Sequence, residues 1–427
     1  MLKKIFILAA CLNIALASFA QDYSLSGTLN KQSPIYTPGE NMEFTVKLLD
    51  GDKPVAGKKL KWTRTGDDGI TREGEDVSTA EGLKINTSTD KPGFVRIYVK
   101  AFNEDGKPVN GITANGQKDK SKPIFFDGGA CVAPETLQGV QEPADFDAYW
   151  KKQKDILASV PMKVIEMKEV PGNDKVKAFD VKIACAGKMP VSGYLVMPKN
   201  AAAKSLPAEV SFHGYGVRGS SLNLSSGENK ISFNINAHGI PNGQPKEYYE
   251  NLKELKGYAF SKEENANPDT SYFNGMYLRV MRAMEFVKSL PEWNGKDLRA
   301  SGGSQGGMQS LIAAGLDKDV NDCDAWSPWN CDFGRTELKR LVGNWHVAYT
   351  PALNYYDPVN HVKRANPRCK LFIVSNLGDY TCPPSGVWIA YNNFPGPKTM
   401  EIRQGCEHGF SMKNYPKFTI SANQQAK

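Results

Sequence analysis

A serine inside a glycine-rich segment is the first feature of this sequence that could do chemistry. Residues 302–306 fit the pattern G-x-S-x-G, with Ser304 at the centre. Residues 298–300 predict a strand and residues 305–314 predict a helix, which is the context in which this pattern presents a nucleophile. Glycines permit the sharp turn, and the backbone N–H of Gln305 then points to the place where an oxyanion forms. The segment therefore predicts a serine nucleophile; the alternative is a glycine-rich helix start.

A nucleophilic serine needs a base and a carboxylate that orients it, and the strand–turn–helix context predicts the chain order Ser, acid, His. His408 follows the last predicted strand and is the candidate base. Asp379 follows the strand before that one and is the candidate acid, because open α/β sheets build sites at the carboxyl ends of strands. Asp357 is the rival acid, although it precedes that strand. Glu407 is expected to support His408, and His361, in a polar segment, is expected at the surface.

The second oxyanion donor is expected in the loop after an earlier strand. Residues 208–212 predict an apolar strand, and His213, Gly214 and Tyr215 follow it. We nominate the backbone N–H of Tyr215 as this donor and expect His213 to be structural. The rings of Tyr215 and Tyr380 are expected to wall a short acyl pocket.

The histidines and cysteines do not have the spacing of a metal site. The five His show neither H-E-x-x-H nor H-x-H, and the eight Cys form no C-x-x-C pair. We therefore predict no metal, and covalent serine chemistry requires no cofactor. Cys323 and Cys331 could form a disulfide or serve as small buried apolar residues.

Composition excludes several classes of protein. The chain has 427 residues, of which 40% are hydrophobic and 23% charged, so wholesale disorder is excluded. The formal net charge is +7, without any block of five or more like charges. A nucleic-acid or membrane-surface footprint needs clustered basic residues, so neither partner is predicted.

The first twenty residues predict a cleavable signal peptide. Lys3 and Lys4 precede an almost wholly apolar run over residues 5–17, and Ala20 is the expected cleavage point. The run is too short for a spanning helix, and no other stretch approaches 18 apolar residues. We therefore expect a periplasmic or secreted protein without a membrane span.

The elements that must position these residues divide the chain in three. Residues 21–127 show short alternating runs separated by Gly, Asp and Pro turns, which predict a small β-sandwich of immunoglobulin-like type. Residues 128–163 are expected to be a linker and a helix that begins near Pro143. Residues 164–427 alternate strands and helices, which predicts a largely parallel sheet with helices on both faces and a final helix after His408.

The predicted sandwich holds no His and no Cys, so it is poor material for catalysis. A spacer or packing role is favoured, with carbohydrate binding as the alternative. On this interpretation a chain that begins near residue 130 keeps its activity on a small ester.

The predicted catalytic region resembles carbohydrate esterase family seven, the acetyl xylan esterase and cephalosporin C deacetylase group. The similarity covers roughly residues 140 to 415 and is carried by several short motifs: 212–215, 302–307, 331–333, 356–357, 379 with 383–385, 390–392, and 407–408. The resemblance implies an α/β-hydrolase fold and a triad of Ser304, Asp379 and His408, with oxyanion donors Tyr215 and Gln305.

The resemblance further implies removal of acetyl groups from sugars or small molecules, and such enzymes often form homo-oligomers. One departure concerns residues 237–239, where the family carries Arg-Gly-Gln and this chain has Ala-His-Gly. Four tryptophans are candidates for a sugar-facing pocket: Trp326, Trp329, Trp345 and Trp388.

The sequence thus predicts a serine esterase for acetylated sugars such as xylan or xylo-oligosaccharides. An esterase for a bulkier acyl group, such as feruloyl, is the first alternative. A non-catalytic carbohydrate-binding protein on a hydrolase scaffold is the second, and the intact Ser, Asp and His set argues against it.

Overall fold

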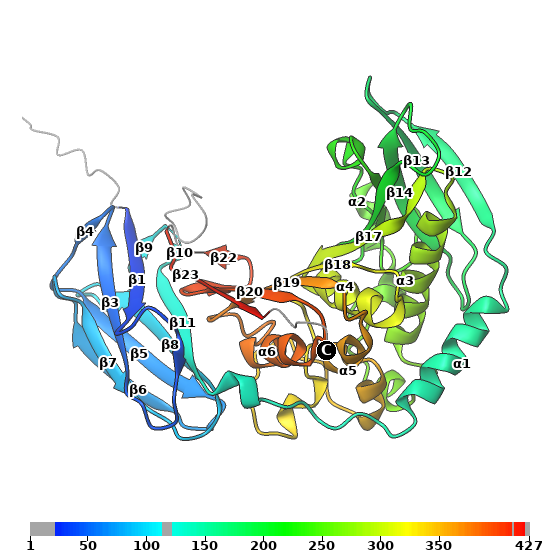
Figure 1. The fold of residues 1–427 in the computed structure, drawn as a ribbon. Helices are drawn as coiled ribbons and strands as arrows, with labels where there is room; N and C mark the ends of the chain where they lie inside the picture. The colour runs from blue at the N-terminus through cyan, green and yellow to red at the C-terminus, as the bar shows by residue number, and fades with distance from the viewer. Residues whose placement is uncertain (1–21, 113–121, 412–413, 423–427) are drawn as a thin grey trace, which may run out of the picture.

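The fold is that of a computed structural model, which describes residues 22–112, 122–411 and 414–422 (Figure 1). The predicted signal peptide, residues 1–20, lies outside the described residues. Within the described ranges, every helix is too short or too polar to cross a bilayer.

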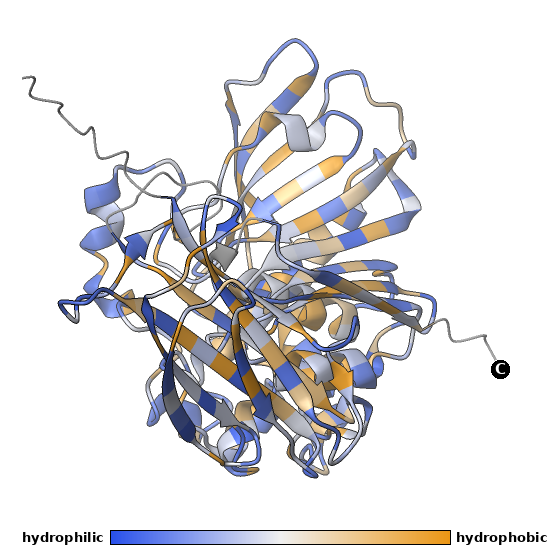
Figure 2. Ribbon diagram, turned by 90° about the vertical axis from the view of Figure 1, so that its left-hand side faces the viewer, coloured by the Kyte–Doolittle hydropathy of each residue, from blue (hydrophilic) through white to orange (hydrophobic). Residues whose placement is uncertain are grey.

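The N-terminal region is all β, as predicted. One sheet has the order β2-β11-β8-β5-β6, and the other joins β1, β3, β4 and β7. Alternating side chains fill the core between them, and Figure 2 shows this alternation along the strands that face the viewer. The strands are β1 (Tyr23–Leu29), β2 (Ile35–Tyr36), β3 (Met42–Asp50), β4 (Lys53–Pro54), β5 (Lys59–Gly66), β6 (Arg72–Val77), β7 (Leu83–Thr87), β8 (Gly93–Phe102), β9 (Asn110–Gly111), β10 (Lys122–Pro123) and β11 (Phe125–Val132).

Strand β11 extends into the segment that the sequence predicted as linker. Gly128 and Gly129 lie inside this strand, which pairs antiparallel with β8. A side chain at Gly129 would meet the backbone oxygen of Val95, so glycine here serves a close backbone approach and not a flexible joint. The sandwich therefore ends at Val132, and the connection to the next region starts after it.

The second region is built on a ten-stranded sheet with the order β12-β13-β14-β16-β15-β17-β18-β19-β20-β23. The six strands from β16 to β20 in this order are parallel, and the remaining pairings are antiparallel. This is the predicted mostly parallel sheet. Its strands are β12 (Val164–Val170), β13 (Val176–Ile183), β14 (Val191–Pro198), β15 (Leu206–Phe212), β16 (Ile231–Ile235), β17 (Trp293–Gly303), β18 (Asp322–Trp326), β19 (Lys370–Asn376), β20 (Lys398–Arg403) and β23 (Lys417–Ala422).

Helices cover mainly one face of this sheet. Figure 1 shows α3, α4, α5 and α6 on the same side of the strands. Helix α4 is mostly apolar and every residue of it is buried, as expected for a helix inside a core. The α-helices are α1 (Phe146–Ala158), α2 (Lys246–Glu250), α3 (Tyr272–Ser289), α4 (Gln305–Leu316), α5 (Pro358–His361) and α6 (Pro384–Asn393). The 3-10 helices are η1 (Pro134–Thr136), η2 (Leu224–Gly227), η3 (Lys253–Leu255), η4 (Glu264–Ala266), η5 (Phe333–Thr336), η6 (Pro351–Tyr355) and η7 (Val362–Arg364).

The opposite face of the central strands differs from the expectation of helices on both sides. Several side chains on this face are polar and bind one another: Ser301 donates to Glu209, and Arg299 pairs with Asp324.

The end of the chain also differs from the prediction of a final helix. After the short hairpin of β21 (Cys406–Glu407) and β22 (Phe410–Ser411), β23 pairs antiparallel with β20. Residues 417–422 alternate between exposed and partly buried positions, which is the period of a strand and not of a helix.

Candidate active site

Ser304 lies at the tip of the turn between β17 and α4. Its φ of 56° and ψ of −120° belong to a conformation that non-glycine residues rarely adopt. Two backbone hydrogen bonds hold the turn: Ser304 N–H donates to Trp326 O at 2.8 Å, and Trp329 N–H donates to Ser304 O at 3.0 Å. A side chain at Gly306 would collide with the backbone of Phe212, so the helix packs directly on the end of β15. The hydrogen bonds and close packing of the surrounding backbone therefore hold Ser304 in this unusual conformation.

Asp379 and His408 meet at the carboxyl ends of β19 and β20. Nδ1 of His408 lies 2.9 Å from Oδ2 of Asp379, which is fully buried. The other oxygen of Asp379 accepts backbone N–H groups from Thr381 at 3.1 Å and Cys382 at 2.8 Å. These bonds fix the carboxylate, which in turn fixes the imidazole and leaves its Nε2 as the free nitrogen.

Ser304 and His408 open into one cavity of about 460 Å³. Between them the described side chains form no direct hydrogen bond, as in many sites that tighten only around substrate. The lining residues are Gly214, Tyr215, Ser304, Trp329, Trp345, Thr381 and His408. Tyr380, predicted to wall the acyl pocket, is buried outside this lining.

The surroundings of His408 act on its pKa in opposite directions. Burial alone lowers the pKa of this imidazole, but the hydrogen bond and charge of Asp379, together with the charge of Glu407, raise it above the usual value. Stabilisation of the imidazolium in this way suits a group that must take up a proton from a serine.

The loop with Gly214 and Tyr215 carries the predicted oxyanion donor. Its next residue, Gly216, donates its N–H to the hydroxyl of Tyr258 at 3.0 Å, and this hydroxyl donates to Oε1 of Gln305 at 2.6 Å. The backbone N–H of Gln305 is one of the first-turn groups of α4 that have no acceptor within the helix. The hydroxyl of Tyr258 thus connects the loop of Tyr215 to the start of α4, the two segments that carry the nominated N–H groups.

Buried and partly buried side chains support the same loop. His238 bonds the carbonyl of Gly216 through Nε2 at 3.1 Å and the hydroxyl of Tyr272 through Nδ1 at 2.5 Å. His213 accepts the N–H of Ala237 at 3.3 Å. Burial lowers the pKa of His213 to about 4 and that of His238 to about 3, so both are neutral supports of the loop. Residues 237–239, Ala-His-Gly, therefore contact the loop of Tyr215 through His213 and His238.

A profile of the acetyl xylan esterase family (AXE1) matches residues 136–344 and 346–421. The chain belongs to the acetyl xylan esterase family. Acetyl esterase Axe7A of Xylanibacter ruminicola is 29% identical over 295 residues, which cover 65% of this chain and 66% of that protein, just under two thirds of its length.

Two solved structures of the family share the fold. An acetyl xylan esterase from Paenibacillus sp. R4 is 25% identical with a TM-score of 0.54, over 64% of this chain and 92% of its own. Acetyl xylan esterase 1 from Thermoanaerobacterium sp. JW/SL YS485 is 23% identical with a TM-score of 0.54, over 66% and 93%. The predicted family and α/β-hydrolase fold are confirmed, and the family profile begins only after the N-terminal sandwich.

Aromatic rings crowd the cavity on the side of Tyr215. Its ring stacks on Tyr258 at 4.2 Å and meets the edges of Trp329 and Trp345 at 5.5 and 5.1 Å. Trp345 is 46% exposed. Of the other two tryptophan candidates, Trp388 is buried in the core and Trp326 lies outside this cavity.

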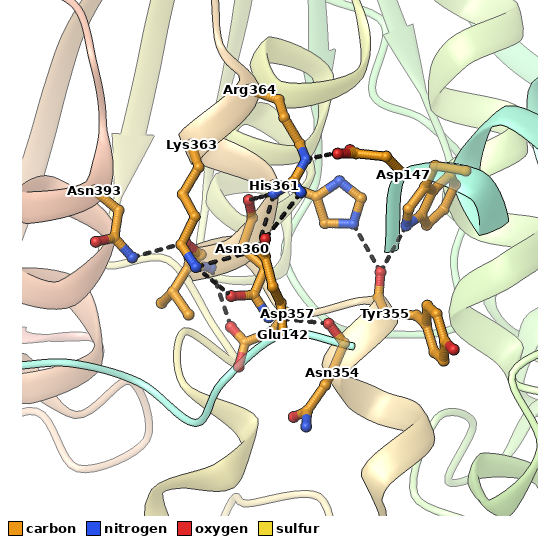
Figure 3. Close-up of polar contacts among 12 residues, drawn as sticks. Glu142, Asp147, Asn354, Tyr355, Asp357, Asn360, His361, Lys363, Arg364 and Asn393 are labelled. Atoms are coloured by element: carbon orange, nitrogen blue, oxygen red, sulfur yellow. Dashed lines mark hydrogen bonds and ion pairs between the residues drawn. The ribbon is translucent and has the colours of Figure 1, made fainter. Parts of the chain in front are cut away.

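The rival acid Asp357 lies in a different cluster (Figure 3). It caps α5 and accepts N–H groups of Asp332 and Phe333 at 3.0 and 2.7 Å. His361, in the same cluster, is fully buried and bonds the carbonyl of Tyr355 at 3.0 Å, so its predicted surface position is wrong. Apolar and aromatic neighbours from α1 cover it, which the polar sequence around it did not reveal.

Seven cysteines in the described ranges are free, Cys323 and Cys331 among them. Cys382 lies within 4.8 Å of the polar atoms of Asp379 and His408. Burial raises the pKa of its thiol well above the usual value, which disfavours the thiolate that a nucleophile or metal ligand needs.

Proposed function

We propose that this protein is a serine esterase that removes acetyl groups from acetylated sugars, with xylan and xylo-oligosaccharides as the leading substrates. The observation that carries the proposal is the hydrogen bond from His408 to the buried Asp379, at the same cavity as Ser304, in a chain of the acetyl xylan esterase family. The names of the relatives agree with acetyl ester hydrolysis.

In the proposed mechanism Ser304 attacks the acetyl carbonyl while Nε2 of His408 takes its proton. Asp379 holds the imidazole in the tautomer with a proton on Nδ1 and stabilises the imidazolium. His408 then returns the proton to the departing sugar oxygen, which leaves an acetyl-enzyme. Water, deprotonated by His408, attacks this ester, and acetate and free Ser304 result.

The backbone N–H groups of Tyr215 and Gln305 are the proposed donors to the oxyanion of both tetrahedral intermediates. Donors fixed before the reaction contribute most in a site shielded from water, and one such donor is worth about 10²–10³ in kcat. Tyr258 supports this role because its hydroxyl joins the two segments that supply the donors.

The cavity supports a small acyl group next to a sugar. Tyr215, Trp329 and Trp345 give it aromatic walls, and the exposed face of Trp345 offers a ring on which a sugar can stack. The signal-like segment before residue 21 supports export to the periplasm or the exterior, where plant polysaccharide is met.

Acetate release from acetylated xylo-oligosaccharides tests the proposal, with Ser304→Ala as the inactive control. On p-nitrophenyl esters we expect kcat/KM to fall at least about tenfold from acetate to butyrate, a difference of about 1.4 kcal/mol in the transition state. A profile that rises towards longer acyl groups favours the bulky-acyl esterase instead. Sugar binding without acetate release favours a non-catalytic carbohydrate-binding protein on a hydrolase scaffold.

A further inference from the structure

The loop that carries His408 is fastened to the N-terminal sandwich. Gln404 is buried and lies between β20 and β21. Its side-chain amide pairs with the backbone of Gly129 through two hydrogen bonds, as a neighbouring strand would. Nε2 donates to the carbonyl of Gly129 at 2.8 Å, and Oε1 accepts the N–H of Gly129 at 2.9 Å. Gly129 belongs to β11, so the base loop rests on a strand outside the family fold.

The loop that carries Asp379 touches the same strand. A side chain at Gly378 would collide with the backbone carbonyl of Asp127, and one at Gly129 would come within 3.2 Å of the carbonyl of Leu377. The acid and base loops are also bonded to each other, since Gly378 N–H donates to Cys406 O at 2.9 Å. The two loops are therefore bonded to each other, and both pack against β11.

Arg96 of β8 closes this contact. Its Nε donates to Oδ1 of Asp127 at 2.8 Å, a second bond joins Nη2 to Oδ2, and the guanidinium lies 4.5 Å from the ring centre of Tyr380. Tyr380 directly follows Asp379, so the stacked ring holds the chain at the acid. A planar guanidinium can bond a carboxylate and stack on a ring together, which an ammonium group cannot do as well.

Several carboxyl groups lie around this contact, and the positive charge of Arg96 offsets their mutual repulsion. Asp127 is fully buried, and burial together with the nearby Asp379 raises its pKa to about 6 against the effect of Arg96. Burial and Asp127 raise the pKa of Glu407 to about 7, again opposed by Arg96. Arg96 thus faces several acidic groups at the back of the Asp379–His408 pair.

The sandwich also supports the segment that carries Trp345. Asp67, in the turn after β5, accepts the N–H of Leu341 at 2.9 Å and that of Phe94 at 2.9 Å. A side chain at Gly343 would strike the carbonyl of Tyr380, so this segment and the acid loop are in direct contact.

We infer that the N-terminal sandwich is part of the catalytic unit, and that Arg96 and Asp127 are positioning residues that hold the Asp379 and His408 loops against Ser304. The inference rests on the proposed esterase function for its kinetic consequence only. The contacts themselves predict a mechanical effect on the two loops that is independent of any substrate.

The test compares Arg96→Gln and Arg96→Lys in the full chain. Arg299→Gln is the matched control, because Arg299 also pairs with a strand aspartate but lies on the polar sheet face away from the cavity. Hydrogen exchange measured by mass spectrometry should accelerate at residues 376–382 and 404–409 in Arg96→Gln. Residues 298–316, around the nucleophile turn, should keep their exchange rates.

For kinetics we expect kcat on p-nitrophenyl acetate to fall about 10–100-fold in Arg96→Gln with KM within about twofold, since displaced catalytic groups weaken only the transition state. Arg96→Lys should recover part of kcat, and it provides a folded variant if Arg96→Gln is unstable. Unchanged exchange in both loops, with kcat within about twofold, overturns the inference. Failure of the function itself has another signature: wild-type protein that releases no acetate while the exchange effect persists.

Discussion

The two halves of the candidate site are built in different ways. The nucleophile half is local: a strand, a four-glycine turn and a helix place Ser304 and Gln305, and backbone bonds to the end of β18 and the residues just after it complete it. The acid–base half is assembled from two loops that follow different strands and rest on β11, about 250–280 residues earlier in the chain. The first half can be read as a motif. The second depends on contacts that no short stretch of sequence contains.

The largest expected effect belongs to the nucleophile half. Ser304→Ala should lower kcat for ester hydrolysis by about 10⁴ or more, because the triad acts as a unit. The melting temperature should stay near that of the wild type. Ser310→Ala is the control: this buried hydroxyl bonds the carbonyl of Gly306 within α4, and its loss should spare activity. Hydrolysis that survives in Ser304→Ala would assign the chemistry to another group.

In the acid–base half, Asp379→Asn should lower kcat by about 10⁴, because an amide cannot hold the required tautomer of His408. Asp357→Asn should mainly lower the melting temperature, since Asp357 accepts backbone N–H groups of Asp332 and Phe333 and caps α5. Steady-state kinetics and thermal unfolding of the two variants check this separation. Greater kinetic damage from Asp357→Asn would reverse the assignment of the acid.

Removal of residues 22–132 tests directly whether the acid–base half depends on the sandwich. The sequence predicted that a chain without the sandwich keeps activity on a small ester, but the contacts of Gln404, Gly378 and Leu341 reverse that expectation. We expect kcat on p-nitrophenyl acetate to fall about 10²-fold, the effect of a misplacement of order 1 Å. A folded truncated chain with wild-type kcat would show that the acid–base half stands alone.

The contrast explains what the sequence could and could not predict. The motif around Ser304, the order of acid and base, and the alternating strands are local signals, and the family and fold drawn from them are confirmed. Gly128 and Gly129 read as a linker because glycine in isolation signals a turn, whereas their neighbours Gln404 and Leu377 are distant in sequence. Tyr258 was missed for the same reason: residues 243–271 have no periodic pattern, and its role appears only beside Gly216 and Gln305.

Tyr258→Phe tests the nucleophile half with a smaller change. The variant keeps the ring that stacks on Tyr215 but leaves Gly216 N–H without its acceptor and Gln305 without its donor. An unsatisfied buried group costs about 1–3 kcal/mol, so we expect kcat to fall about tenfold through the displaced Tyr215 loop. Full kcat in this variant, measured on p-nitrophenyl acetate, would mean that the loop is held without this bridge.

The smallest effect concerns Glu407 and the pH profile. The base works only when His408 is neutral, so kcat/KM falls on the acid side as His408 takes up a proton. Glu407 helps to raise the pKa of His408, and Glu407→Gln removes that contribution. The acid limb of kcat/KM should therefore move to lower pH while the plateau stays unchanged.

The shift should be small because burial and Asp127 raise the pKa of Glu407 itself to about 7, so that this carboxyl carries only part of its negative charge near neutral pH. Asp379 keeps the dominant hold on the imidazole through its hydrogen bond of 2.9 Å. A limb that moves to higher pH would mean that Glu407 stabilises neutral His408, against the sign of its charge. A collapse of the plateau would mean instead that Glu407 holds the base loop in place, as Gln404 does.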